Sequence, residues 1–231
     1  DDDLNTLADY VYKKVYLGYS SKQWGVDPKT LDKSVTARVP VFLSRDNRYF
    51  QDKYQGIPLN GYSGIIKNML NHKNIELRLN TNFKELNEYF DRIFYTGAID
   101  EYFDYCFGEL PYRSLNFEVE TLDKQYYQQN SVVNFPCDFD YTRIHEFKYY
   151  NDVKCSKTVI AREYPCAFVL GKNERYYPII NPKNNELYNK YLELAKKEEN
   201  VYFLGRLGEY RYYDMDDAID CAIRLFENLF N

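Results

Sequence analysis

Three arginines, Arg38, Arg143 and Arg206, lie in separate stretches of the 231-residue chain. A guanidinium group forms paired hydrogen bonds to phosphate or carboxylate oxygens, and an aromatic ring stacks on a flat base. Together these groups would suit a ligand that contains a base, sugars and a diphosphate. Sequence spacing does not prove that they converge, and Arg38 could equally be a surface residue. The aromatic residues that could take part are Tyr19, Trp24, Tyr49, Tyr177 and Tyr212.

Arg143 belongs to a stretch, residues 141–149, whose period of two predicts a strand with Arg143, His145 and three aromatic rings on one face. An arginine on such a face is costly to desolvate unless an anion meets it. That anion could be a ligand. The alternative is an internal ion pair, for instance with Glu118 or Glu163 on neighbouring strands. For His145 the pattern favours an ordinary hydrogen-bonding role.

Residues 205–216 join a buried-strand pattern at 201–204 to a helical pattern that starts near Met215. The start of a helix exposes backbone N–H groups at a positive dipole end, where anions bind. The alternative is a capped helix whose acidic residues merely suit the dipole. Those residues are Asp214, Asp216 and Asp217.

Composition excludes several classes of function. The net charge of -5, without a basic stripe, argues against non-specific nucleic-acid binding. The sequence contains no run of about 18 apolar residues that would predict a membrane span, and we expect a cytoplasmic protein. Five cysteines without a Cys-x-x-Cys pair indicate reduced thiols and no zinc or other metal site. With two histidines, each lacking a nucleophile motif, a Ser-His or Cys-His hydrolase is poorly supported.

The first half of the chain alternates helices with loops. A first helix, with Leu4 and Val15 on its apolar face, is expected to end near Gly18, followed by a polar turn that holds Trp24. Residues 32–60 are expected to form an ordered loop. Further elements are expected as a helix around 65–70 and strands at 75–79 and 91–96.

From Arg113 to Ile180 five short alternating runs follow one another, which predicts an antiparallel sheet. A helix at about 185–197, the strand at 201–204 and a closing helix complete the chain. The fold class expected is mixed α/β (α+β), with an antiparallel sheet of about six strands, a helical region and the remnant of a Rossmann-like domain.

Eight motifs, in this order, resemble those of the bacterial UDP-galactopyranose mutases, from about Tyr10 to Asp220. So many ordered motifs make coincidence a poor explanation. They are residues 19–25 (YSSKQWG), 34–40 (SVTARVP), 46–50 (DNRYF), 110–115 (LPYRSL), 141–144 (YTRI), 162–165 (REYP), 176–179 (YYPI) and 205–216 (GRLGEYRYYDMD).

The resemblance implies an isomerase that interconverts UDP-galactopyranose and UDP-galactofuranose for cell-surface glycans. In this family reduced FAD is the nucleophile: its N5 forms a covalent adduct with galactose while UDP departs and returns. The protein then supplies position and charge. The resemblance also implies a homodimer in the full-length enzyme.

By the same resemblance, Arg38 and Arg143 hold the diphosphate and stabilise its departure. Tyr19 stacks on uracil, Ser20 is a neighbouring polar contact, and Trp24 belongs to a mobile lid. Further substrate contacts are Tyr49, Asn134, Tyr177, Tyr212 and Asp214. The cofactor side comprises Arg206, Met215, Asp216, Asp217, Ala218 and Ile219.

One departure from the family pattern is large. Its members begin with a Gly-x-Gly-x-x-Gly turn that binds the ADP half of FAD, and this chain contains no Gly-x-Gly. We therefore expect a C-terminal part of a longer enzyme that binds FAD weakly or not at all and is inactive alone, with exposed strand edges that favour association. The alternative is a UDP-sugar-binding module without catalysis; a flavin amine oxidase would need the same absent motif.

The regions expected on this basis are four. They are a helical substrate-binding region with the lid (1–74), a partial FAD-domain segment (75–112), the antiparallel substrate domain (113–180), and a helix, strand and C-terminal helix of the FAD domain (181–231).

Overall fold

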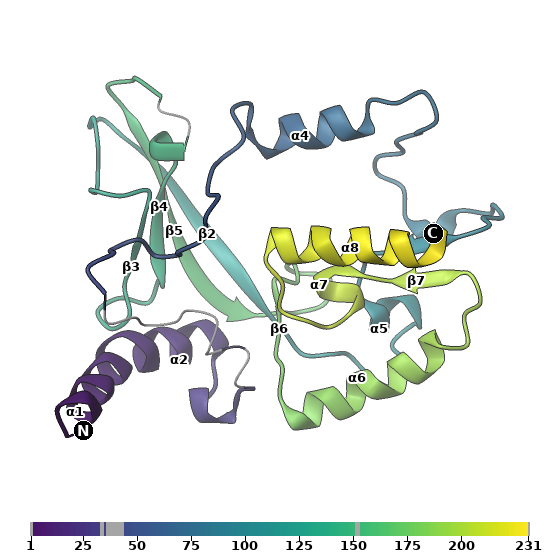
Figure 1. Cartoon of the computed structure of the whole chain (residues 1–231), viewed down its shortest axis with the longest axis horizontal. Coiled ribbons are helices and arrows are strands. Elements are labelled where there is room, and N and C mark those ends of the chain that lie inside the picture. The colour runs from purple at the N-terminus through teal and green to yellow at the C-terminus, as the bar shows by residue number, and fades with distance from the viewer. Residues whose placement is uncertain (1, 33–34, 36–43, 151–152, 231) are drawn as a thin grey trace.

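The computed structural model describes residues 2–32, 35, 44–150 and 153–230. Figure 1 shows an antiparallel sheet with the N-terminal helices on one side of the molecule, and a parallel strand pair with the C-terminal helices on the other. The long strands β2 (Tyr112–Leu122) and β5 (Thr158–Ala167) run between these two parts. The expected mixed α/β class is confirmed.

The antiparallel sheet has five strands, which correspond to the five alternating runs of the sequence. Their order across the sheet is β3-β4-β5-β2-β6, and every neighbouring pair is antiparallel. The estimate of about six strands was one too many for the described residues. The strands are β2 (Tyr112–Leu122), β3 (Val132–Asn134), β4 (Arg143–Glu146), β5 (Thr158–Ala167) and β6 (Tyr177–Pro178), with the 3-10 turn η4 (Phe147–Tyr150) after β4.

The N-terminal helix does not end near Gly18 as expected. It runs through α1 (Asp2–Val11), the π-helical η1 (Tyr12–Leu17) and α2 (Gly18–Trp24), and it ends at Gly25, which has a left-handed φ of 66°. A Cβ atom on Gly18 would lie 2.5 Å from the Pro136 carbonyl oxygen, so this glycine permits close helix–loop packing. Trp24 consequently lies in the last turn of a helix, not in a polar turn.

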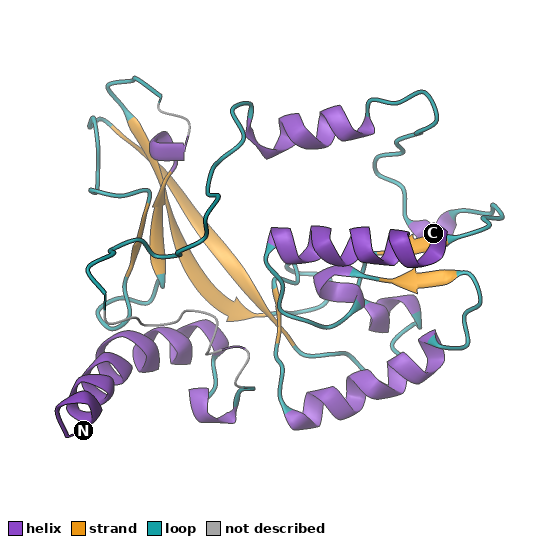
Figure 2. Cartoon of the chain, in the orientation of Figure 1, coloured by secondary structure: helices purple, strands orange, loops and turns teal. Residues whose placement is uncertain are grey.

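The segment between the two parts of the molecule is mostly loop. It contains η2 (Pro28–Thr30), α4 (Gly61–Leu70) and η3 (Phe83–Glu85), and α4 stands apart from the other helices (Figure 2). The strand expected at 75–79 is absent from these described residues, so that prediction was wrong. Alternation alone did not form a strand there because no neighbouring strand pairs with the segment.

The second part is built on two parallel strands, β1 (Ile93–Tyr95) and β7 (Val201–Phe203). Around them lie the helices α5 (Ile99–Tyr102), α6 (Pro182–Ala195), α7 (Gly205–Gly208) and α8 (Met215–Phe230). The expected strands near 91–96 and 201–204 and both late helices are therefore confirmed. A core cluster joins this part to β2 through Ile99, Leu110, Tyr112, Tyr191 and Tyr210.

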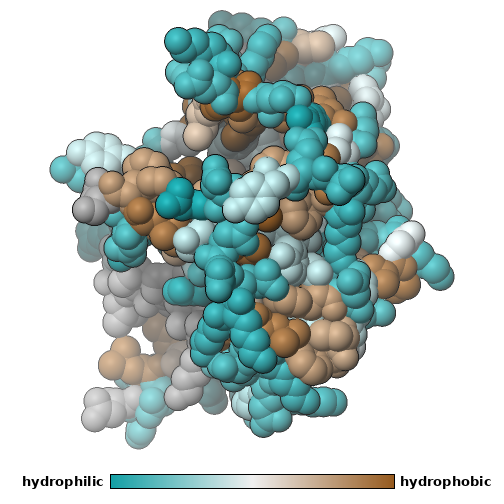
Figure 3. Space-filling model, turned by 90° about the vertical axis from the view of Figure 1, so that its right-hand side faces the viewer, coloured by the Kyte–Doolittle hydropathy of each residue, from teal (hydrophilic) through white to brown (hydrophobic). Residues whose placement is uncertain are grey.

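One face of α8 is left uncovered. Its apolar residues follow helical spacing, yet 48–60% of each side chain is exposed. Figure 3 shows hydrophobic side chains between hydrophilic ones on the face seen from the right-hand side of Figure 1. The exposed residues of α8 are Met215, Ile219, Ile223, Phe226 and Phe230.

No helix among the residues that the structure describes is both long and apolar enough to cross a membrane.

Candidate functional site

Three aromatic rings from distant parts of the chain meet beside the antiparallel sheet. The ring centroid of Trp24 lies 5.9 Å from that of Tyr177 and 5.7 Å from that of Tyr212, and the two tyrosine rings are 5.3 Å apart. The rings are tilted or edge-on, the geometry that aromatic pairs prefer. Trp24 is 6% exposed and packs with Leu31 in a second core cluster. The structure thus brings together three residues that the sequence placed in separate motifs.

Arg206 lies on this aromatic cluster. Its guanidinium carbon is 5.2 Å from the Tyr177 ring centroid and 5.1 Å from that of Tyr212. It donates hydrogen bonds to the carbonyl oxygens of Tyr176 (3.0 Å) and Tyr213. Arg206 therefore holds the 205–213 segment against the rings. The resemblance implied only that Arg206 lies on the flavin side of the site, and this structural contact was not expected.

Arg143, on β4, faces Tyr19 of α2. Its guanidinium carbon lies 5.6 Å from the Tyr19 ring centroid, and a terminal nitrogen donates to the Tyr19 hydroxyl. The Nε atom is 3.1 Å from the Oε1 atom of Glu163. The internal ion pair considered from the sequence is therefore present with Glu163, while Glu118 instead accepts a hydrogen bond from Tyr164 (2.9 Å).

Two tyrosines of the site, Tyr19 and Tyr177, have raised pKa values and are uncharged at neutral pH. Burial raises the pKa of Tyr19, and the groups that act on it electrostatically include Arg143, Tyr177 and Tyr212. Burial likewise raises the pKa of Tyr177 to about 12. For Arg143, burial lowers the pKa, but Tyr19 and Glu163 outweigh that effect and the net change is a rise. A permanent cation thus sits among neutral phenols, an arrangement that can bind an anion.

Glu163 is 3% exposed and is the centre of a polar network. It accepts a hydrogen bond from Thr142 Oγ1 (3.3 Å) and lies 3.1 Å from His145 Nε2, whose other ring nitrogen is 3.2 Å from the Tyr150 hydroxyl. The hydrogen-bonding role expected for His145 is confirmed. The sequence analysis considered Glu163 as a partner of Arg143, but nothing in its spacing indicated the wider network.

Of the remaining residues expected to contact the substrate, some lie near Arg143 and the aromatic cluster and others do not. Ser20 is buried in α2, and Asn134 is the cross-strand partner of Arg143 between β3 and β4. Tyr49 is 60% exposed and packs edge-on against Phe50, so the structure does not bring it into the aromatic cluster. Arg38 lies outside the described residues.

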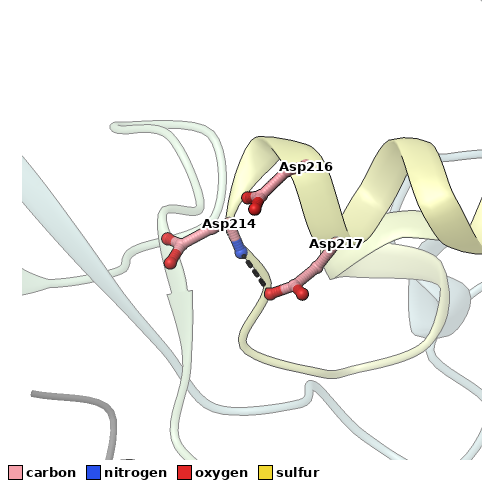
Figure 4. Close-up of side chains that lie close together, drawn as sticks. All are labelled: Asp214, Asp216 and Asp217. Atoms are coloured by element: carbon pink, nitrogen blue, oxygen red, sulfur yellow. Dashed lines mark hydrogen bonds between the residues drawn. The ribbon is translucent and has the colours of Figure 1, made fainter. Parts of the chain in front are cut away.

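Three carboxylates gather at the start of α8 (Figure 4). One ligand atom from each of Asp214, Asp216 and Asp217 lies within 4.8 Å of the others. The backbone N–H of Asp214 donates to Asp217 Oδ2 (3.2 Å), as in the capped-helix alternative. Negatively charged side chains are stabilised by the helix dipole at the N-terminal end of a helix, so the acidic cluster can be explained without a metal ion.

The described residues offer groups for part of an FAD molecule only. Met215 and Ile219 expose apolar side chains next to the α8 start, and Ala218 is half-buried between them. These could border a ring system. The sequence, however, has no glycine-rich turn for a pyrophosphate, and the guanidinium of Arg206 is engaged with backbone carbonyls.

Two residues that hold α2 in place were not singled out from the sequence. Arg113 of β2 donates to the carbonyl oxygens of Gln23 (2.8 Å) and Lys22 (3.3 Å). The Lys22 side chain reaches in turn to the β3–β4 connection. Both lie within recognised motifs, yet a lysine or arginine in a helix or strand gives no signal of a long-range backbone contact.

Comparison with known proteins places this geometry in a family. The family described as UDP-galactopyranose mutase (GLF) matches residues 14–212. The chain is 39% identical over 240 residues to a dTDP-fucopyranose mutase of Escherichia coli, covering 97% of the chain and 63% of that protein. It is 39% identical over 226 residues to a probable UDP-galactopyranose mutase of Klebsiella pneumoniae, covering 96% and 58%.

A UDP-galactopyranose mutase of Mycoplasma pneumoniae is 37% identical over 240 residues, covering 96% of the chain and 60% of that protein. The fold is similar to a crystal structure of reduced UDP-galactopyranose mutase, with a TM-score of 0.67, 18% identity and coverage of 93% and 65%. The chain thus spans about three fifths of the length of these relatives. With the recognised motifs, the match over residues 14–212 establishes that the chain belongs to the UDP-galactopyranose mutase family.

Proposed function

We propose that this chain provides the UDP-sugar-binding part of an isomerase that interconverts UDP-galactopyranose and UDP-galactofuranose for glycan synthesis. The observation that carries the proposal is Arg143, a half-buried cation that faces Tyr19 beside the cluster of Trp24, Tyr177 and Tyr212. A permanent cation next to stackable rings matches the chemistry of a nucleoside diphosphate.

In this proposal each residue binds one part of the substrate. Tyr19 stacks on uracil with Ser20 beside it, and Arg143 binds the diphosphate together with Arg38. Because charge on the phosphate oxygens increases as UDP departs, these cations stabilise the departing group more than the ground state. Trp24, as part of the lid, and Tyr49, Asn134, Tyr177, Tyr212 and Asp214 complete the proposed substrate contacts.

Reduced FAD would supply the nucleophile of the reaction in the complete enzyme, with Arg206, Met215, Asp216, Asp217, Ala218 and Ile219 on its side of the site. Because the 231 residues lack a pyrophosphate-binding turn, we expect the isolated chain to bind FAD weakly or not at all and to have no mutase activity. An absorption spectrum of the purified chain tests this expectation, and a stoichiometric flavin spectrum would contradict it.

The isolated chain would then behave as a UDP-sugar-binding module, the second candidate function. UDP binding without turnover by the chain alone supports that description, whereas ring contraction of UDP-galactopyranose by the chain with a reductant would show catalysis.

The identity of the base is a further part of the proposal, since one relative acts on a dTDP-sugar and others on a UDP-sugar by name. Thymine carries a methyl group that uracil lacks. We propose UDP because the matching family is described by that substrate. Parallel titrations with UDP and dTDP test this, and tighter binding of dTDP would reverse it.

The site itself is tested by titrating UDP while following the fluorescence of Trp24, the single tryptophan of the chain. Replacing Arg143 by Ala should weaken UDP binding by about tenfold or more, because a half-buried charge contact to phosphate is lost. Arg78→Ala is the control, since Arg78 forms exposed ion pairs with Glu76 and Glu88. Equal affinity of the wild type and Arg143→Ala would contradict the proposed site.

The family resemblance also supports a cytoplasmic enzyme that forms a homodimer when complete, and the four regions 1–74, 75–112, 113–180 and 181–231 as its substrate-binding and FAD-domain parts. Fractionation of cells measures the location directly, and sedimentation of the complete enzyme measures its oligomeric state.

A further inference from the structure

We propose that Lys22 is a positioning residue that sets the distance between α2 and the β3–β4 connection, and so holds Tyr19 opposite Arg143. This inference rests on the proposed function, because it concerns how the base and the diphosphate of one nucleoside diphosphate are bound at the same time. The hydrogen bonds of the Lys22 side chain described below go to backbone carbonyl oxygens, and none of them goes to Tyr19 or Arg143.

The Lys22 ammonium group donates to three backbone carbonyl oxygens of one connection. They belong to Phe135, Phe139 (2.8 Å) and Tyr141 (3.1 Å). An ammonium group has three N–H donors, so this set uses all of them. Burial lowers the pKa of Lys22, with Cys137, Asp140 and Asp138 acting in the opposite direction.

The three acceptors lie at both ends of the connection. Phe135 directly follows Asn134, the last residue of β3, and Tyr141 lies two residues before Arg143, the first residue of β4. The rings of the connection also pack together, with Phe139 stacked on Tyr141 at 4.8 Å. A movement of this unit relative to α2 would therefore move Arg143 as well.

On the helix side, Lys22 and Tyr19 are three residues apart and so are neighbours on the surface of α2. The helix approaches the connection so closely at Gly18 that a Cβ atom there would meet the Pro136 carbonyl oxygen at 2.5 Å. Lys22 is thus a direct link between the element that carries Tyr19 and the connection that leads into Arg143.

This arrangement predicts a selective effect on binding. A ligand that reaches both Tyr19 and Arg143 depends on the distance between α2 and β4, whereas uridine, which has no phosphate, depends on the α2 side. Loss of the link should therefore reduce the additional affinity that the diphosphate provides, and leave uridine binding unchanged. A general loss of stability would weaken both ligands alike.

The experiment compares Lys22→Met with the wild type by titrating UDP and uridine while following Trp24 fluorescence. UDP should bind about tenfold more weakly to the variant, because Arg143 and Tyr19 are no longer held at the matching distance, and uridine binding should be unchanged. Lys22→Arg should recover affinity, because a guanidinium can donate to the same carbonyls, and Lys22→Gln should fall between. Lys190→Met, an exposed lysine on α6, is the control.

Hydrogen exchange of the apo proteins is the second measurement and keeps the proposal testable without a ligand. Amides of residues 135–141 should exchange faster in Lys22→Met, while those of β2 and β5 stay protected. Unchanged UDP affinity with unchanged exchange would overturn the positioning role and leave the proposed function standing. If the wild type does not bind UDP, the proposed function fails for this chain, and the exchange data alone support or overturn the link.

Discussion

The Nε atom of Arg143 lies 3.1 Å from the Oε1 atom of Glu163, and the two residues are also directly paired in the β4–β5 register. The carboxylate therefore compensates the arginine charge from one side, while a terminal nitrogen points to the Tyr19 hydroxyl on the other. A half-buried cation held in this way keeps its orientation when no anion is bound.

Replacing Glu163 by Gln should lower the free energy of unfolding by about 1–3 kcal/mol. This loss is smaller than that expected for a fully buried ion pair, because the Arg143 side chain is 26% exposed. UDP should stabilise the variant more than the wild type, since the diphosphate supplies the missing negative charge. Urea unfolding with and without UDP measures both effects.

The control for this prediction is Glu120→Gln, because Glu120 pairs with Arg162 at 2.9 Å but is about half exposed. Its effect should stay within about 1 kcal/mol. Equal losses in the two variants would show that the position of Glu163 has no special importance.

Gly25→Ala should destabilise the protein by about 1–2 kcal/mol, because Gly25 has a left-handed backbone that costs an L-residue about this much. In addition, a Cβ atom would lie 2.8 Å from a terminal nitrogen of Arg113, which holds the end of α2. The neighbouring Trp24 should change its emission as well.

Gly56→Ala is the matched substitution, since no atom would lie within 4 Å of the new methyl group. Its unfolding free energy should differ from the wild type by less than about 0.5 kcal/mol. A Gly25→Ala protein as stable as this control would show that the cap and the Arg113 contact tolerate a side chain.

Asp100 is fully buried, and burial raises its pKa above the ordinary value of 3.8, although the hydrogen bond from the Leu110 N–H (2.8 Å) opposes the shift. A raised folded-state pKa contributes stability that is present below the unfolded value and is lost as pH rises through the folded value. Asp100→Asn removes this titration. The variant should therefore gain stability relative to the wild type as pH rises from 3.8 towards neutrality.

Urea unfolding of both proteins at a series of pH values measures this difference. A constant difference across the series, or one that favours the wild type as pH rises, would show that the Asp100 carboxylate is not penalised by burial.

The uncovered face of α8 should cause the isolated chain to associate, together with the outer edges of the β1–β7 sheet, which pair with no further strand among the described residues. The double variant Ile219→Glu and Ile223→Glu should sediment as a smaller species than the wild type, because both side chains are more than half exposed on that face. Val119→Glu, at an exposed position on β2, should leave association unchanged. A wild type that is monomeric at all concentrations would contradict the prediction.

Much of the secondary structure could be predicted because the local pattern and the tertiary environment agree. The alternation in residues 112–122 and 158–167 matches two long strands that pair along their length. The helix predicted at about 185–197 corresponds to α6 (Pro182–Ala195), which begins earlier than predicted, at Pro182, with the Asn181 side chain as its cap. The ordered motifs were also sufficient to identify the family, since they do not depend on contacts.

Other features depended on partners that are distant in sequence. Gly18 and Gly25 both follow helical residues, and their roles differ only because Gly18 meets Pro136 whereas Gly25 adopts a left-handed φ. Residues 75–79 alternate like a strand, but a strand requires hydrogen bonds from a neighbour. The sequence likewise left open whether Arg143 would meet Glu118 or Glu163. That choice was made by the register of β4 on β5, because cross-strand pairing determines which carboxylate lies opposite the arginine.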